Sequence, residues 1–176
     1  MTLYEMGKLS KQLSQARLDK WYIDFATWQF YFLLLCLVLP WLIWIHYARR
    51  HDAPRGVYFF GVLVALLTSF IDQAGVFYSL YIYPIKIFPF LDTFVTAYIG
   101  VVPVFYMFIY TYSQSWKQYL PALTVTAIFF SFVLEPLNVW IGVYIMMAWT
   151  YYYSTLVYLV VGLIAKVATD RLYLIK

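Results

Sequence analysis

The side chains best suited to chemistry are two carboxylates, Asp72 and Glu135, each set inside a long apolar run. Asp72 lies sixteen residues after Gly56, where its run begins, and Glu135 lies sixteen residues after Tyr119. At about 1.5 Å per helical residue, each acid lies roughly 24 Å along a path whose hydrocarbon part is about 30 Å. We therefore expect both carboxylates at a similar depth in a membrane.

Carboxylic acids at that depth can take part in proton transfer. A site of low dielectric constant keeps an acid protonated, so that it can donate its proton to an alkene or epoxide, and a second carboxylate can accept one later. Aromatic faces can stabilise the intervening carbocation. We take Glu135 as the first-choice acid and Asp72 as its partner, as in a membrane cyclase or isomerase of isoprenoids. The alternative is that both acids only hydrogen-bond neighbouring helices.

Polar and aromatic side chains surround the two acids in the sequence. Asn138 shares a helix face with Glu135, and Ser154, Tyr158 and Gly162 recur every four residues on the last apolar run. We expect these faces and that of Asp72 to converge. The side chains expected to bind a lipophilic molecule there are Trp140, Tyr81, Tyr144, Trp149, Tyr153, Tyr158 and Asn138.

Other catalytic signatures are missing from the sequence. It contains no Gly-rich phosphate loop, no HExxH, no G-x-S-x-G and no paired histidines, and its single cysteine, Cys36, excludes thiolate metal spacing. We therefore expect neither a metal ion nor a cofactor.

The composition places the chain in a membrane. It is 65% apolar and only 11% charged, against about 25% charged in a typical soluble domain. The net charge of +4 comes from residues at the ends of apolar runs, which suits lipid headgroups better than nucleic acid. The expected partners are membrane lipids, a hydrophobic small molecule and other subunits in a homo- or hetero-oligomer.

The apolar runs predict an all-α, polytopic bundle with five spans in one domain, residues 27–176. The expected spans are residues 28–47, 56–76, 93–112, 119–139 and 150–169. Asp92, three residues before Val95, is expected to cap the third span. Residues 1–26 carry apolar and basic residues at helical intervals, which fits an amphipathic helix on the membrane surface or a short solvated segment.

Spans two and three resemble spans four and five. An offset of 63 residues matches Asp72 with Glu135, and the same offset matches Tyr81 with Tyr144. Val76, Phe77 and Ile82 match Val139, Trp140 and Ile145. Because a repeat of two spans enters the membrane twice in the same direction, it predicts both acids on the same side.

The basic residues predict an orientation. One side of the bundle holds the N-terminal segment and Lys86. The other side holds the larger group of basic residues, which comprises Arg49, Arg50, Arg55, Lys117, Lys166, Arg171 and Lys176. By the positive-inside tendency, a cell-membrane protein of this kind has its N-terminus outside.

Several of these residues also carry a resemblance. Asp72 followed by Tyr83-Pro84 and Pro89, then Glu135 followed by Trp149 and Tyr153-Ser154, is similar to an uncharacterised family of small multi-pass membrane proteins from spore-forming Bacillota. The similarity covers about residues 56–160 and implies the same topology. More remotely, repeated helical units with one acid each resemble the heterodimeric lycopene cyclases and transmembrane terpene cyclases, which have more spans and fuller acid-rich motifs.

Overall fold

The computed structural model describes residues 2–51, 53 and 56–173, and it is built almost entirely of helices. The helices are α1 (Leu3–Asp24), α2 (Trp28–Ala48), α3 (Val57–Phe77), α4 (Val102–Tyr112), α5 (Trp116–Phe129), α6 (Glu135–Trp140) and α7 (Tyr151–Tyr173). Two π-helical segments, η1 (Thr96–Val101) and η2 (Phe130–Leu134), run directly into α4 and α6. The two short strands are β1 (Tyr81–Ile82) and β2 (Ile145–Met146).

Four of the helices are long and apolar enough to cross a membrane. They are Trp28–Ala48, Val57–Phe77, Trp116–Trp140 and Tyr151–Tyr173, whereas Thr96–Tyr112 is apolar but shorter. The predicted all-helical class is therefore confirmed, and the four long helices fit a multi-pass membrane protein. The bounds of these four helices lie within four residues of the predicted ones. The helix that corresponds to the fourth predicted span begins at Trp116 instead of residue 119.

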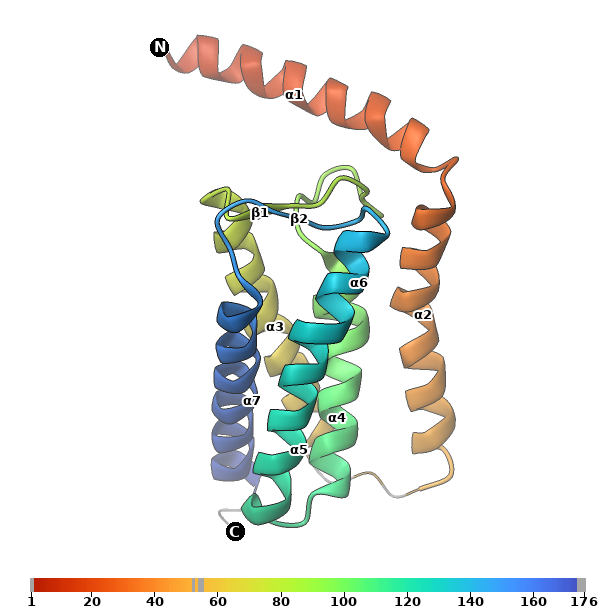
Figure 1. The fold of residues 1–176 in the computed structure, drawn as a ribbon, viewed down its shortest axis with the longest axis vertical. Helices are drawn as coiled ribbons and strands as arrows, with labels where there is room; N and C mark the ends of the chain where they lie inside the picture. Colours follow the sequence, from red (N-terminus) through yellow and green to blue (C-terminus); the bar gives the residue numbers. More distant parts are fainter. Residues whose placement is uncertain (1, 52, 54–55, 174–176) are drawn as a thin grey trace.

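The core lies where α3, α4, α5 and α7 pack together (Figure 1). Its largest fully buried side chains include Phe60, Tyr106 and Tyr119. The hydroxyls of Tyr106 and Tyr119 donate to the carbonyls of Tyr158 and Gly162 on α7, at 2.8 and 2.9 Å. The core tyrosines thus bury their rings and still satisfy their hydroxyls, which avoids the cost of an unpaired polar group.

Helix α2 stands at the edge of the bundle and contacts mainly η1 (Figure 1). Its outward side is almost entirely apolar and exposed, including Leu35, Val38, Leu39, Leu42 and Ile43. A contiguous apolar face of this extent is typical of a surface that contacts lipid. Trp41 fixes α2 to its neighbour, because its indole N–H donates to the carbonyl of Ile99 at 2.8 Å.

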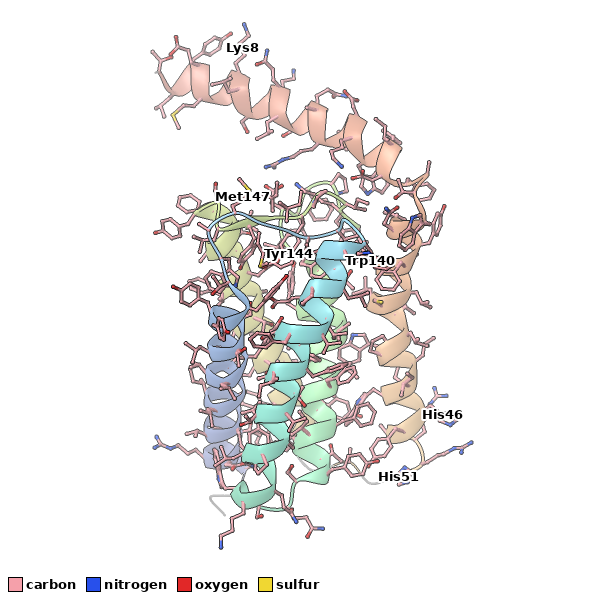
Figure 2. All side chains as sticks on the ribbon, in the orientation of Figure 1. Lys8, His46, His51, Trp140, Tyr144 and Met147 are labelled. Carbon is pink, nitrogen blue, oxygen red and sulfur yellow. The ribbon has the colours of Figure 1, made fainter. Side chains whose placement is uncertain are left out.

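One end of the bundle carries the connection from α3 to η1 and the connection from α6 to α7. Strands β1 and β2 pair there antiparallel, with Tyr81 opposite Met146 and Ile82 opposite Ile145. Figure 2 shows Trp140, Tyr144 and Met147 at this end, with His46 and His51 at the other. We call the end that carries the two strands the loop end. Among the basic residues used for the orientation, Arg55 and Lys176 lie outside the described residues.

Helix α1 crosses the loop end of the bundle (Figure 1). The helix predicted in residues 1–26 is present, and its position on a membrane surface stays a prediction. Its second half is fastened to residues 84–92. Arg17 pairs with Asp92, Lys20 donates to the carbonyl of Pro84, and the Trp21 indole N–H donates to the carbonyl of Ile87 at 2.9 Å.

The predicted capping role of Asp92 is wrong. The residue before η1 is Val95, which has no side-chain cap, and the Asp92 carboxylate is instead shared by Arg17 and Lys86. The cause is tertiary: α1 brings a guanidinium to Asp92, and an ion pair of this kind satisfies more of the carboxylate than one backbone N–H would.

This ion-pair group gives a first prediction. In Asp92→Asn, α1 should open more often from the loop end, and deuterium uptake over residues 15–24 should rise, because both charged partners lose their anion. Global stability should change by only about 1 kcal/mol, since partly exposed ion pairs contribute little. Asp19→Asn is the matched control, because Asp19 is exposed on α1 and accepts a hydrogen bond from the neighbouring Gln15 side chain. Unchanged uptake in Asp92→Asn would mean that the ion pairs do not hold α1.

Candidate functional site

Asp72 lies near the C-terminal end of α3 and is bonded through both of its oxygens. One oxygen accepts from the Tyr83 hydroxyl at 2.7 Å, and the other accepts from the backbone N–H of Phe94, also at 2.7 Å. Phe94 lies two residues before Thr96, the first residue of η1. Asp72 therefore ties the end of α3 to the segment that leads into η1.

Glu135 is the first residue of α6, directly after the π-helical segment η2. Its two carboxylate oxygens accept from the hydroxyls of Ser154 and Tyr158 on α7, at 2.8 and 3.1 Å. Ser154 in turn accepts from the indole N–H of Trp149 at 2.8 Å. The predicted convergence of the Glu135 face with the Ser154 and Tyr158 face is therefore confirmed.

Asp72 and Glu135 line the same cavity, which measures about 90 Å³. An engineered apolar cavity of about 150 Å³ takes up benzene, so this cavity can hold a group of several heavy atoms but not a whole lipid. Its aromatic walls come from Tyr81, Tyr83, Phe94, Tyr98, Tyr144, Trp149 and Tyr158. We call it the acid cavity.

Five of these aromatic rings, those of Tyr81, Tyr83, Phe94, Tyr144 and Trp149, form one connected cluster. The Tyr83 ring stacks between those of Phe94 and Tyr144, at centroid distances of 4.8 and 5.4 Å. Tyr81 meets Tyr144 and Trp149 edge to face, at 5.6 Å each. Burial, and then the neighbouring Asp72 carboxylate, raises the pKa of Tyr83, so its hydroxyl stays protonated and donates to Asp72.

The structure brings together some of the predicted binding residues and leaves others outside. Tyr81, Tyr144, Trp149 and Tyr158 line the acid cavity with the two acids. Asn138 lines a neighbouring cavity instead. Trp140 and Tyr153 line neither cavity and are 82% and 52% exposed, because they lie on the outward faces of α6 and α7.

Tyr83, Phe94 and Tyr98 also line the site but were not among the predicted binding residues. Tyr83 follows β1 in a turn, and its one signal in the sequence is the Tyr83-Pro84 pair. Phe94 acts on Asp72 through its backbone N–H, which any residue type except proline would supply. No pattern in the sequence could have revealed that contact.

The polar groups of the site are mainly carboxylate oxygens and the hydroxyls of serine and tyrosine, and they are arranged for hydrogen bonding. Within residues 2–51, 53 and 56–173, no group of three or more His, Cys, Asp or Glu side chains is placed to hold a metal ion. What the arrangement can do is exchange protons between two carboxylates, hydroxyls and a molecule in the cavity.

Fold and site together define a class: a small helical bundle with apolar helices of membrane-spanning length and a cavity with two carboxylates near one end. Comparisons of the chain with protein-family models, curated proteins and solved structures found no match.

Proposed function

We propose that this is an integral membrane protein whose acid cavity binds a lipophilic molecule, isoprenoid or lipid-like. The observation that carries the proposal is that Asp72 and Glu135 line one cavity whose other walls are largely aromatic. Ligand sites are concave, mostly apolar and supplied with a few placed polar groups. Ionisable residues at membrane depth also serve function more often than packing alone.

The reaction that these groups suit is a proton-initiated cyclisation or isomerisation. Protonated Glu135 gives its proton to a carbon of an alkene, which forms a C–H bond and a carbocation. In a cyclisation, a second double bond attacks the cation and forms a C–C bond. The Asp72 carboxylate then removes a proton beside the new cation, which forms a double bond and leaves an isomer of the substrate. Proton transfer from Asp72 back to Glu135 completes the cycle.

The aromatic cluster supports this chemistry. Tyr81, Tyr144 and Trp149 line the acid cavity, and the face of an aromatic ring carries partial negative charge. These rings can therefore stabilise a cation formed between the acids. The resemblance of repeated, single-acid helical units to the transmembrane terpene cyclases favours the same class of reaction, and the likeness to the small membrane proteins of Bacillota favours the same topology.

We further infer that Thr96–Tyr112 is a fifth span and that the bundle is an internal repeat. Helix α3 ends at the loop end and α5 begins at the other end, so the segment between them traverses the bundle (Figure 1). Ile82 and Ile145, equivalent under the offset of 63 residues, face each other across β1 and β2. An axis along the membrane normal would produce this pairing. We also propose that the N-terminus lies outside the cell, the orientation that the basic residues predict.

A non-catalytic role is the second candidate, and a specific observation favours it. Both oxygens of each acid already accept a hydrogen bond from the protein, as structural acids do. The protein would then be an assembly partner or a small permeation subunit in which the acids hold the helices together.

Photolabelling in lipid nanodiscs tests ligand binding. The probe is a geranylgeraniol analogue with a diazirine beside its hydroxyl. We expect saturable labelling of Tyr81, Tyr144 or Trp149, displaced by unlabelled geranylgeraniol and lost in Val157→Trp, which fills the acid cavity. Leu156→Trp, at the adjacent exposed position, should label normally. Labelling that is confined to lipid-facing residues and is not displaced would refute the binding proposal.

Glu135→Gln separates catalysis from a structural role. Lipid extracts are compared between cells that express the natural protein and cells that express the variant. We expect an isomeric lipid, equal in mass to its precursor, to fall by about 10²-fold or more in the variant, since general acids contribute 10²–10⁴-fold. Identical lipid profiles, with the variant present at normal levels, would favour the non-catalytic role.

A further inference from the structure

A second cavity of about 90 Å³ adjoins the acid cavity. Residues Phe32, Leu33 and Cys36 of α2 line one side of it, and Leu134 and Leu137 line the other. Its walls are mostly hydrocarbon. The Thr96 hydroxyl, one of its few polar groups, already donates to the carbonyl of Leu33 at 3.3 Å. We call it the tail cavity.

The two cavities meet at the catalytic acid proposed above. Both are lined by Glu135 and Tyr158, and also by Phe94, Ala97 and Val102. The Glu135–Tyr158 hydrogen bond of 3.1 Å therefore lies in the partition between them. A change of rotamer at Glu135 would break this bond and move a side chain that both cavities share.

The tail cavity lies between the two irregular segments of the bundle. Thr96, Ala97 and Val101 come from η1, while Phe130 and Leu134 come from η2 or its end. π-Helical turns inside α-helices occur frequently at functional sites. Two such segments on one cavity, from distant parts of the chain, are a second observation that points to this space.

We propose that the ligand is a linear lipid that enters both cavities, with its polar or unsaturated end between Asp72 and Glu135, the next several atoms of its hydrocarbon chain in the tail cavity and the remainder of the chain outside both cavities. This inference rests on the proposed function and names its substrate class. A cavity with apolar walls stays dry and takes up hydrocarbon. Neither cavity alone holds more than several heavy atoms, so a ligand that fills both has to be elongated and to pass Glu135.

The first experiment uses the natural chain and two probes in nanodiscs. Both are geranylgeraniol analogues, the head probe with a diazirine beside the hydroxyl and the chain probe with a diazirine on the second isoprene unit. We expect the first probe to label residues of the acid cavity alone, such as Tyr81 and Trp149. The second should label residues of the tail cavity alone, such as Phe32 and Cys36. If both probes label the same residues, the two-cavity arrangement is wrong.

The second experiment fills the tail cavity. Cys36→Trp should weaken displacement of the head-labelled probe by geranylgeraniol about tenfold or more, the effect of losing burial for two or three methylene groups. Displacement by prenol, whose short chain fits the acid cavity alone, should not change. Leu35→Trp, the adjacent and exposed position on α2, is the matched control. A straight-chain unsaturated alcohol, used in parallel, distinguishes acyl from isoprenoid chains.

The outcomes separate the two proposals. Absence of displaceable labelling in the acid cavity refutes the proposed function and this inference with it. Labelling of the acid cavity by the head probe, with no labelling of the tail cavity by the chain probe, refutes the linear arrangement alone. Equal affinity for geranylgeraniol in the natural chain and in folded Cys36→Trp does the same.

Discussion

Asp72→Ala is expected to destabilise the bundle by roughly 2–6 kcal/mol. The substitution leaves two donors without an acceptor, the Tyr83 hydroxyl and the Phe94 backbone N–H, and each unsatisfied buried donor costs about 1–3 kcal/mol. The acid cavity has room for water. A water molecule there can replace part of the lost bonding, which places the expected value in the lower half of the range.

Asp72→Asn is the matched control for this loss. The asparagine carbonyl can accept from the Phe94 N–H, and its amide can donate to the Tyr83 oxygen once that hydroxyl turns. Stability should therefore stay within about 1 kcal/mol of the natural chain, since both bonds persist. Unfolding of the three proteins in detergent, followed by circular dichroism, measures the difference. An alanine variant as stable as the asparagine variant would show that these hydrogen bonds do not support the fold.

Gly100→Leu is expected to separate α2 from the bundle. A Cβ at Gly100 would lie 2.9 Å from the carbonyl oxygen of Cys36 and 2.9 Å from the Cα of Leu37. Both are backbone atoms of α2, so no rotamer change can relieve the clash. Gly100→Ala should cost about 1–3 kcal/mol, the usual cost of overpacking a well-packed contact. The larger leucine side chain should cost more.

The measurement is deuterium uptake of α2 and η1 together with unfolding in detergent. Uptake should rise at both segments in the Gly100 variants. A shift of α2 away from Gly100 would also strain the hydrogen bond from Trp41 to the neighbouring carbonyl of Ile99. Gly7→Ala is the control, because no atom of another segment in the described part of the chain lies within 4 Å of a Cβ at that position. It should stabilise α1 by about 0.5–1 kcal/mol. Normal uptake at α2 in Gly100→Leu would contradict the close approach.

Much of the fold followed from the apolar runs alone. The ends of the long helices could be predicted within four residues, because a membrane requires about 20 apolar residues per span and excludes charge from the middle. The residue count along each helix also predicted Asp72 and Glu135 at a similar depth, and the structure places both in the lining of one cavity. The exposure of Trp140 and Tyr153 could not be predicted in this way, because which face of a helix is buried depends on the segments that pack against it.

The sequence by itself determined the helices, their approximate bounds and the pairing of Glu135 with the Ser154 and Tyr158 face, since helical periodicity places those side chains. Only the tertiary structure decided that Phe94 supplies a backbone donor to Asp72, that Asp92 serves α1 instead of a helix start, and that a tail cavity adjoins Glu135. Each of these depends on contacts between segments far apart in the chain. Local patterns carry no information about which distant backbone group or charge will arrive there.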